Sequence, residues 1–529
     1  MDLHTAGHRR GIVAAPHAAA VEAGRAILVE GGNAIEAMVA MAAVVAVVYP
    51  HMNQIGGDGF WLIREPSGRV RALMAAGVAG SRARPELYRE AGLDQIPARG
   101  PLAALTVPGA IAGWTLALEA AHAQGGRLPL AEMLTAAIGH AREGFAISRS
   151  QSACATLAGL HGAPGFAETF LVDGKPPAAG MKLQQRPLAA TLEQLAHSGL
   201  DDFYRGDVGR EIADDLAHIG SPVTRPDLAA CRAAVAEPLS VALAAGTAYN
   251  TPPPTQGLAS LIILGLFDRL RVRQAEDFDH IHGLVESSKL ALALRDRYLT
   301  DPQRLPYPPG RYLEAAFLDA QALMIDRRRA ARWSPCGGGG DTTWMGAADA
   351  SGLVVSYIQS LYWEFGSGCV LPRTGVLMQN RGVSFSLAPD ARNRLEPGRL
   401  PVHTLNPAVA VLADGRIMAY GTMGGDAQPQ IQAALFTRHV GYRVPLAEAL
   451  DRPRWTLGPT WGSPHASLMV ESRLDEDVIE RLRAAGHDVE VLPQAYADSM
   501  GHAGAVLLHP NGTLEGAHDP RADGGAAGV

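Results

Sequence analysis

The chain has 529 residues, more than one ordinary hydrophobic core accommodates, so its length predicts two domains or one large layered domain. Hydrophobic residues make up 47% and charged residues 19% of the chain, a balance that excludes a disordered protein and is typical of a globular enzyme. The formal net charge is −7 and no block of lysine and arginine stands out, which argues against nucleic acid as a partner.

The sequence favours a cytoplasmic location and no membrane partner. The residues after Met1 lack the apolar core of a secretory signal, and the apolar run 37–48 is too short to span a bilayer. The four cysteines (Cys154, Cys231, Cys336 and Cys369) are scattered without a Cys-x-x-Cys spacing. This pattern predicts reduced thiols and suggests neither a zinc site nor a disulfide framework.

The first part of the chain is predicted to be helix-rich. Apolar residues recur at helical spacing in residues 18–29, 34–47, 110–123, 130–143, 188–197 and 208–218. Gly31-Gly32 ends the first of these segments, and Asn33 stands where an N-cap would begin the second. Short strands are predicted at residues 60–64 and 239–243, helices at 258–269 and 279–300, and a largely exposed connector with one short helix at 304–340.

After Thr342 the pattern changes to short β-branched or alternating segments separated by turn residues. Strands are predicted at residues 343–348, 353–360, 376–379, 408–412, 417–421, 489–492 and 503–509, and helices at 429–440, 445–451 and 476–485. No internal repeat of fixed period appears, which argues against solenoids and propellers. The chain therefore divides into a helix-rich part, residues 1–341, and a strand-rich part, residues 342–529.

Four consecutive glycines, Gly337 to Gly340, lead to the bond between Asp341 and Thr342. Glycine offers little steric resistance to distortion, so the peptide bond after the run can adopt conformations that most sequences forbid. The Thr342 hydroxyl could then attack the carbonyl of Asp341, and hydrolysis of the resulting ester would cut the chain. The new N-terminal threonine would carry a nucleophile and, in its α-amine, a base. The ordinary alternative is a surface linker that precedes a Thr-Thr pair.

An N-terminal threonine hydrolase also needs groups that position the nucleophile and stabilise the oxyanion. Thr343 and Ser360 are candidates to hydrogen-bond the Thr342 hydroxyl, although both are also ordinary strand hydroxyls. Gly424-Gly425 follows a predicted strand and precedes a predicted helix, so its two amides could point into a cavity and receive negative charge. A plain strand-to-helix turn is the alternative for this pair.

Other motifs favour no second chemistry. The block Gly56 to Gly59 precedes a strand rather than a helix, the wrong order for a dinucleotide fingerprint, and no phosphate-binding GxxxxGK[ST] sequence occurs. His280 and His282 lie two apart on a predicted helix and face different directions, which makes them a poor metal pair. Cys336 and Cys369 flank the proposed site, where an incidental or buried thiol is the expected interpretation.

Ordered blocks along nearly the whole chain resemble the γ-glutamyltransferase family of N-terminal nucleophile hydrolases. The blocks are Gly31 to Ala37, Pro50 to Phe60, Thr251 to Gly257, Glu286 to Ala291, Asp341 to Trp344, Phe365 to Gly368 and Gly424-Gly425. The resemblance implies an α+β fold, a four-layer αββα sandwich to which both parts of the chain contribute. It also implies cofactor-free autocatalytic cleavage between Asp341 and Thr342 into large and small subunits. These subunits would form a heterodimer, with a dimer of heterodimers left open.

The sequence departs from the family pattern where a γ-glutamyl group would bind. Family members clamp the glutamyl α-carboxylate with an arginine and a Ser-Ser pair, and the α-amine with an Asn and a Gln-x-x-Asp. Here the early loop, residues 75–78, has no arginine, and His403-Thr404 replaces the Ser-Ser pair. Tyr362 replaces the Asn, while Arg381 and Ser384 replace the Gln and the Asp.

Arg381 puts a cation where the family holds an ammonium group. A guanidinium can bind a carboxylate through two parallel hydrogen bonds. We therefore expect a small amide substrate that carries a carboxylate and no α-amino group, bound by Arg381 together with His403, Thr404, Tyr362 and Ser384. A structural arginine paired with a nearby acid is the alternative.

Three segments, Asn380 to Gly382, His403 to Pro407 and Tyr420 to Gly425, resemble the branch of the family that contains oxamate amidohydrolases of bacterial purine breakdown. Oxamate is a carboxylate joined directly to a carboxamide, which suits the expected role of Arg381. Some cephalosporin and glutaryl acylases look similar too, and they also take an acid-terminated acyl group. Two further alternatives are a γ-glutamyltransferase or glutathione hydrolase with a rebuilt clamp, and a non-catalytic relative with a binding role.

Overall fold

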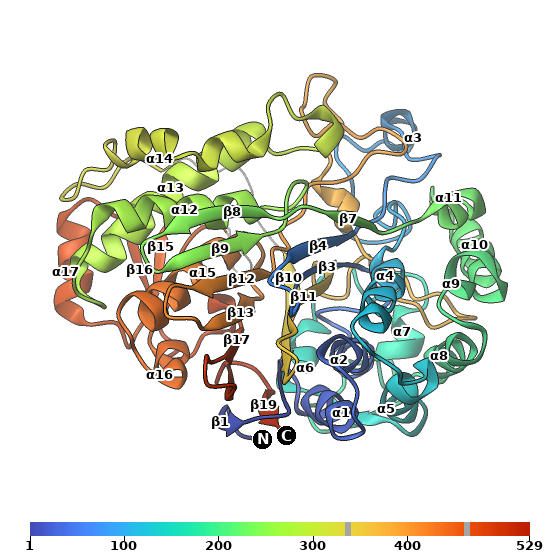
Figure 1. Ribbon diagram of the computed structural model, residues 1–529. Coiled ribbons are helices and arrows are strands. Elements are labelled where there is room, and N and C mark those ends of the chain that lie inside the picture. Colours follow the sequence, from blue (N-terminus) through green and yellow to red (C-terminus); the bar gives the residue numbers. More distant parts are fainter. Residues whose placement is uncertain (334–339, 460–465) are drawn as a thin grey trace.

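Two antiparallel sheets lie face to face and carry helices on both outer sides (Figure 1). The computed structural model describes residues 1–333, 340–459 and 466–529. In these residues each sheet has seven strands, in the order β1-β18-β17-β13-β12-β9-β8 for sheet I and β19-β2-β10-β11-β3-β4-β7 for sheet II. The layers therefore follow the αββα order that the family resemblance implied.

The strands of sheet I are β1 (His4–His8), β8 (Leu239–Leu243), β9 (Gly246–Asn250), β12 (Ala408–Leu412), β13 (Ile417–Thr422), β17 (Ala503–Leu508) and β18 (Leu514–His518). Those of sheet II are β2 (Gly11–Ala15), β3 (Asp58–Arg64), β4 (Val70–Ala75), β7 (Ala234–Ala236), β10 (Asp341–Asp349), β11 (Val354–Tyr362) and β19 (Gly525–Gly528). A small sheet holds β14 (Trp455–Leu457), β15 (Leu468–Glu471) and β16 (Val489–Leu492), and β5 (Phe145–Ala146) pairs with β6 (Lys182–Leu183).

The helices before residue 250 are α1 (Ala18–Val29), α2 (Ala34–Val48), α3 (Pro85–Glu90), α4 (Ala110–Ala123), α5 (Leu130–Glu143), α6 (Arg149–Cys154), α7 (Phe166–Phe170), α8 (Arg186–Ser198), α9 (Asp202–Arg205), α10 (Asp207–Ile219) and α11 (Arg225–Ala230). Those after it are α12 (Gly257–Leu270), α13 (Phe278–Tyr298), α14 (Ala315–Ala322), α15 (Gln428–Phe436), α16 (Leu446–Asp451) and α17 (Glu476–Ala484). Helices α1, α2 and α4 share a core with sheet II, and α12, α13 and α15 share one with sheet I.

Helix α2 forms the centre of the helical layer on sheet II. Asn33 caps its first turn by accepting from the amides of Ile35 and Glu36, while the Glu36 carboxylate accepts from the Asn33 amide. Every residue of α2 is buried, so the apolar run 37–48 packs inside the protein. In the described residues no helix is both long enough and apolar enough to cross a bilayer.

A third core fills the space between the two sheets, and Trp344 of β10 is its largest side chain. The Trp344 indole donates a hydrogen bond to Ser356 Oγ (2.9 Å). On the facing sheet, a Cβ at Gly421 or Gly504 would lie only 2.1 or 2.4 Å from the indole. Glycine at these two positions therefore makes room for the ring, which fixes β10 against sheet I.

Strands from both sides of residue 342 are interleaved in each sheet. In sheet II, β10 pairs with β2 on one side and β11 on the other, and β11 then pairs with β3. In sheet I, β12 pairs with β9, and β1 pairs with β18. The two chain ends also lie together (Figure 1), and the amide of Ala526 donates to Asp2 O (2.9 Å).

Most of the elements predicted from the sequence are confirmed, but the predicted strand at 376–379 is wrong. The amides of Leu377 and Gln379 donate to Gln54 Oε1 and Gly56 O, so this segment packs against a loop rather than a strand. The strands that were not predicted are β1, β2, β4, β5, β6, β7, β9, β14, β15, β18 and β19. Several of them are rich in glycine and alanine, which are weak strand formers, and tertiary pairing stabilises them instead.

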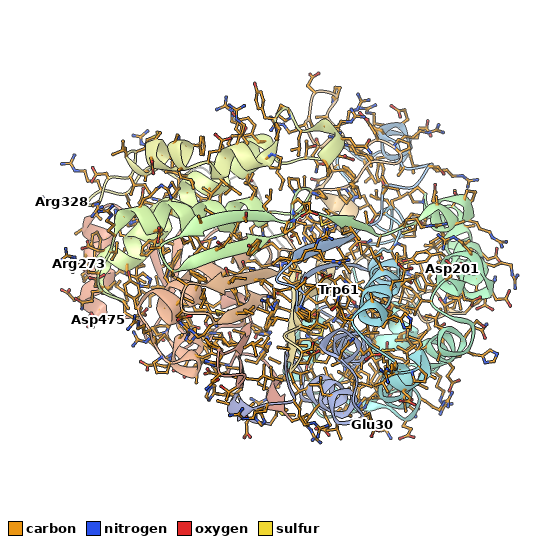
Figure 2. All side chains as sticks on the ribbon, in the orientation of Figure 1. Glu30, Trp61, Asp201, Arg273, Arg328 and Asp475 are labelled. Carbon is orange, nitrogen blue, oxygen red and sulfur yellow. The ribbon has the colours of Figure 1, made fainter. Side chains whose placement is uncertain are left out.

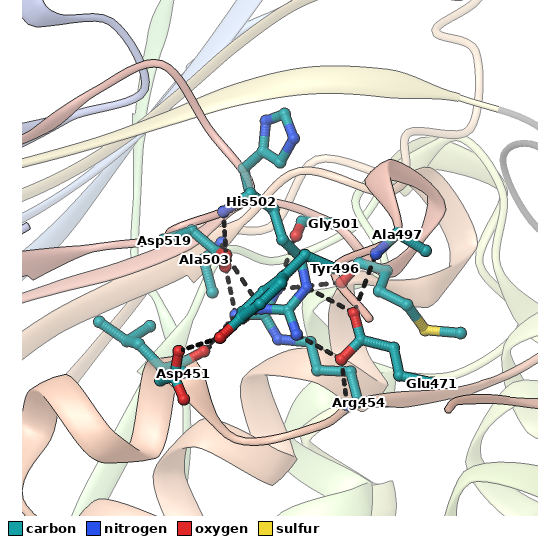
Figure 3. Close-up of polar contacts among 12 residues, drawn as sticks. Asp451, Arg454, Glu471, Tyr496, Ala497, Gly501, His502, Ala503 and Asp519 are labelled. Atoms are coloured by element: carbon teal, nitrogen blue, oxygen red, sulfur yellow. Dashed lines mark hydrogen bonds and ion pairs between the residues drawn. The ribbon is translucent and has the colours of Figure 1, made fainter. Parts of the chain in front are cut away.

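A buried network of charges lies under the C-terminal strands (Figure 3). Arg521 pairs with Glu471 and Asp519, and Arg454 pairs with Asp519. Burial alone would raise the pKa of Asp519, but the two guanidinium groups hold it below its usual range. By contrast, the charged residues Glu30, Asp201 and Arg328 lie at the rim of the molecule (Figure 2).

This network supports the turn next to the loop of Gly424. Arg454 Nη1 donates to Gly501 O (2.6 Å), and Asp519 accepts from the amide of Ala503 (2.7 Å). Between these residues, His502 O accepts from the amide of Met423 (3.2 Å), one position before Gly424. Buried ion pairs therefore hold the backbone that leads into a predicted part of the site.

Buried histidines make the stability of the fold depend on pH. Burial lowers the pKa of His51 and of His518 to about 3, from an ordinary value of 6.5. Below pH 6.5 the unfolded chain binds protons that the folded chain does not bind, so the free energy of unfolding falls as the pH falls. Each of the two histidines should lower it by about 2 kcal/mol between pH 7 and pH 5.

We expect His51→Gln to reduce this pH dependence, measured as the shift in urea midpoint between pH 7 and pH 5. The matched control is His122→Gln, because His122 is exposed on α4 and its substitution should leave the shift unchanged. A midpoint shift in His51→Gln as large as in the unmodified protein would contradict the expectation.

Candidate active site

Thr342 lies near the start of β10, in the middle of sheet II, and its side chain is 1% exposed. The pairing of β10 with β11 is irregular at this point: Asp341 pairs with Tyr362 and Thr343 pairs with Gln359. The regular ladder therefore begins only after Thr342. The side chain of Asp341, the other residue of the predicted cleavage site, and the glycines Gly337 to Gly339 lie outside what the structure describes.

The predicted oxyanion glycines lie beside Gly340, the residue before Asp341. Gly424 and Gly425 both adopt positive φ angles (120° and 52°), a backbone conformation that favours glycine. A Cβ on Gly340 would lie 3.2 Å from Gly425 Cα and 3.1 Å from the ring of Tyr362. The chain just before Asp341 therefore runs between the glycine loop and Tyr362.

Thr343 and Ser360 both lie in the same part of sheet II as Thr342. The Thr343 hydroxyl donates to the carbonyl of Gln359 (3.1 Å), on the neighbouring strand. Ser360 Oγ accepts from the amide of Tyr362 (2.8 Å), at the end of β11 where Tyr362 has a φ of 86°. The Thr343 hydroxyl thus has a structural role in joining β10 to β11. That Thr343 or Ser360 positions the nucleophile stays a prediction.

All five residues predicted to bind substrate line one cavity of about 730 Å³. They come from three separate segments: the end of β11, the short helical turn at residues 381–384, and the loop before β12. The predicted residues are Tyr362, Arg381, Ser384, His403 and Thr404, and the lining also includes Gln256, Arg295 and Asp426. The five residues therefore lie together, and their role in binding substrate stays a prediction.

Arg381 is a buried cation in this cavity, and it has no ion-pair partner among residues 1–333, 340–459 and 466–529. Its guanidinium lies over the Tyr362 ring, 3.3 Å from the centroid, and Nη1 donates to Thr404 Oγ1 (3.4 Å). Its Nε atom has no hydrogen-bond partner in the described part of the chain, and neither does Ser384 Oγ. Burial lowers the pKa of Arg381.

His403, which lines the same cavity, lies beside Asp58. Its Nε2 atom is 3.2 Å from Asp58 Oδ2, and its ring meets Phe60 edge-on. The other carboxylate oxygen of Asp58 accepts from the amides of Gly77 (3.0 Å) and Gly109 (2.9 Å). Burial lowers the pKa of His403 to about 4 despite the nearby carboxylate, so the imidazole is neutral at neutral pH.

A second buried arginine, which the sequence analysis did not single out, has a different role. Arg295 of α13 pairs with Asp296 (2.6 Å) and with Asp426, so two carboxylates compensate its charge. It also donates to Gln256 Oε1 (2.7 Å). The Gln256 amide group in turn donates to Gly425 O (2.8 Å) and Thr404 O (2.7 Å).

Sequence analysis also missed Gln428 and Asn406, which lie behind Thr342. Gln428 Nε2 donates to Thr342 Oγ1 (3.4 Å), and Asn406 Nδ2 donates to Gln428 Oε1 (3.1 Å). Both residues are fully buried. The sequence offered one signal for them, since uncharged polar residues stand in apolar segments next to the glycine and His403-Thr404 motifs.

Within the described part of the chain, His280, His282 and Cys369 do not line this cavity. As predicted, the side chains of His280 and His282 diverge: His280 contacts Thr437 (2.9 Å) and His282 contacts His487 (2.8 Å). His282, Glu286 and His487 lie close enough to hold a metal ion. However, the Glu286 carboxylate already accepts from Lys289 (2.7 Å) and the Ala331 amide (3.1 Å).

The thiol of Cys369 is buried, which raises its pKa to about 12, and Cys336 lies outside the described residues. The conjugate thiolate of Cys369 is therefore scarce at neutral pH, and Cys369 is unsuited to act as a nucleophile.

The family model described as gamma-glutamyltranspeptidase matches residues 20–529. An oxamate amidohydrolase proenzyme from Klebsiella pneumoniae is 52% identical over 98% of both chains, and a glutathione hydrolase-like proenzyme from Bacillus subtilis is 38% identical over 98% of both. The crystal structure of a cephalosporin acylase from Bacillus halodurans superimposes with a TM-score of 0.90 at 30% identity, covering 99% of this chain and 97% of the acylase. The chain therefore belongs to the gamma-glutamyltranspeptidase family and is an enzyme that hydrolyses amide bonds.

Proposed function

We propose that this protein is a self-processing amidohydrolase that cleaves a small carboxylate-bearing amide, with oxamate as the best candidate. In this proposal the chain cuts itself between Asp341 and Thr342. Residues 1–341 and 342–529 then stay together as a heterodimer. Thr342, now N-terminal, carries the acyl group of the substrate between the two halves of the reaction.

The proposed reaction uses groups that lie around Thr342. Its hydroxyl attacks the amide carbon, and its α-amine, which ordinarily titrates at about 7.7–8.0, takes the proton and passes it to the leaving ammonia. The amides of Gly424 and Gly425 stabilise the negative charge on the carbonyl oxygen. Water then attacks the acyl ester and releases the acid.

One observation carries the choice of substrate: the buried guanidinium of Arg381 has no carboxylate partner in the described chain. Removing a cation from water costs several kcal/mol unless a charge or good hydrogen bonds compensate it. A substrate carboxylate would supply that compensation, and the partnerless Ser384 hydroxyl offers it a second donor. The 52% identity to an oxamate amidohydrolase supports the same substrate.

The charges of the cavity argue against a γ-glutamyl substrate, which carries an α-ammonium group. Asp296 and Asp426 are the acids in the lining of the cavity, and both pair with Arg295. A substrate ammonium would therefore compete with Arg295 for its partners and lie close to Arg381.

A second candidate is an acylase that takes a longer acid-terminated acyl group, such as glutaryl. The cavity of about 730 Å³ favours it, because cavities of roughly 300–1,000 Å³ hold drug-sized ligands. The structural similarity to a cephalosporin acylase points the same way. A higher kcat/KM for a glutaryl anilide than for oxamate would establish this candidate in place of the first.

Substitution of the nucleophile tests processing and catalysis together. We expect Thr342→Ala to remain a single chain of 55.6 kDa without activity, because it lacks the hydroxyl that starts both reactions. The unmodified protein should give two pieces of roughly 36 and 20 kDa, in proportion to length. Intact mass under denaturing conditions measures both. Thr342→Ser keeps a hydroxyl and should be cut, whereas a cut Thr342→Ala protein would refute the mechanism.

The carboxylate clamp is tested by the choice between a charged and a neutral amide. We expect Arg381→Gln to raise the KM for oxamate roughly 10- to 100-fold, because a hydrogen-bonded charge pair is lost. The rate with the neutral analogue oxamide should change little, and processing should stay complete. Steady-state kinetics with both amides measures the ratio.

The matched control for this test is Arg373→Gln, because Arg373 is half-exposed and pairs with Asp214 away from the cavity. It should leave both rates unchanged. If Arg381→Gln fails to fold, or loses activity toward both amides equally, Arg381 is a structural arginine and the substrate assignment fails.

A further inference from the structure

Gln428 lies against the proposed nucleophile, on the side of the glycine loop that leads into α15. It is the first residue of that helix and is fully buried. Its side-chain nitrogen is 3.4 Å from Thr342 Oγ1. No charged group is part of this contact, so Gln428 can act only as a hydrogen-bond donor or acceptor at the reacting oxygen.

The surrounding hydrogen bonds decide which end of the Gln428 amide faces Thr342. The carbonyl of Thr404 only accepts, so it fixes the Asn406 nitrogen toward itself (2.8 Å), with Ser260 donating to the Asn406 oxygen (2.9 Å). The same Asn406 nitrogen then donates to Gln428 Oε1 (3.1 Å). Gln428 must therefore present its N–H group to the Thr342 oxygen.

We propose that Gln428 is a catalytic residue that assists the release of the acyl group from Thr342. This inference rests on the proposed function, because it assumes that Thr342 carries the acyl group as an ester. In that step a water oxygen bonds to the acyl carbon and gives its proton to the Thr342 α-amine. The bond between the acyl carbon and Thr342 Oγ1 then breaks, the electron pair stays on Oγ1, and the α-ammonium returns the proton to it.

The Gln428 N–H group acts on the leaving oxygen in this step. As the ester bond breaks, negative charge grows on Thr342 Oγ1, and a donor already in place stabilises it without reorganisation. When Thr342 Oγ1 attacks the substrate, the same donor withdraws electron density from the attacking oxygen and weakens it as a nucleophile. The donor therefore does not accelerate acylation as it accelerates release of the acyl group. Gly424 and Gly425 are proposed to act on a different atom, the carbonyl oxygen.

The same chemistry applies to self-processing. Attack of Thr342 on the carbonyl of Asp341 would produce an ester to the same Oγ1 atom, and hydrolysis of that ester also requires Oγ1 to leave. Loss of the Gln428 donor should therefore slow the last step of processing as well as turnover.

The test uses Gln428→Met, which keeps an unbranched side chain of similar length and removes the donor. The matched control is Gln430→Met: Gln430 is equally buried on the same helix but pairs with the backbone of Leu457. For the processed Gln428→Met protein we expect kcat for oxamate to fall roughly 10- to 100-fold, with kcat/KM changed much less. Gln430→Met should retain the kcat of the unmodified enzyme.

The decisive measurement is intact mass after acid quenching during turnover. In Gln428→Met most small-chain molecules should carry the mass of the acyl group, because removal of that group has become the slow step. Equal acyl fractions in Gln428→Met and the unmodified enzyme, or equal losses of kcat and kcat/KM without acyl accumulation, would overturn the inference.

Two further outcomes separate this inference from the function on which it rests. If Gln428→Met stays uncut, hydroxylamine should cut it before Thr342, because hydroxylamine cleaves an ester; a resistant chain would contradict the role of Gln428. If the unmodified enzyme hydrolyses oxamate with an acyl group on a residue other than Thr342, the proposed function itself fails.

Discussion

The side chain of Gln256 joins the two loops on which the site depends. Its nitrogen donates to Gly425 O in the glycine loop and to Thr404 O in the clamp loop, and its oxygen accepts from Arg295. An arginine can only donate, so the Gln256 amide has one possible orientation. Leaving a buried carbonyl unpaired costs about 1–3 kcal/mol, so this side chain favours one relative position of the two loops. This contact therefore helps to set the distance between Gly425 and Thr404.

The cavity separates two uses of a buried arginine. Arg295 is compensated by Asp296 and Asp426, and its bonds hold the protein together. Arg381 lies over the Tyr362 ring and has no ion-pair partner in the described part of the chain, which is why we propose that it binds a substrate carboxylate. A buried ion pair is weak evidence for stability, whereas a buried cation without an ion-pair partner marks a candidate binding site.

The family resemblance implied the order of the layers, and local signals predicted most of the helices. Helix periodicity predicted α1, α4 and α5, and substitutions within ordered motifs drew attention to Arg381 and His403, which line one cavity. Roles that arise only from packing were not predictable in this way. Arg295 and Asp426 are 131 residues apart in sequence, and Gln428 contacts Thr342 across 86. The segment 376–379 has strand composition, but its neighbour in the fold is the loop at residues 54–56.

The interleaved strands also bear on the lifetime of the enzyme. In sheet II, β2 lies between β19 and β10, and in sheet I, β9 pairs with β12. After a cut before Thr342, strands of the two pieces would still be paired with each other in both sheets, so the pieces could separate only by unfolding. Reassembly would then require two partly unfolded chains to meet, whereas the precursor folds as one chain. Their exposed strands would also favour aggregation. The precursor would be the only species able to fold efficiently, and the durability of the mature enzyme would be a rate of unfolding rather than an equilibrium.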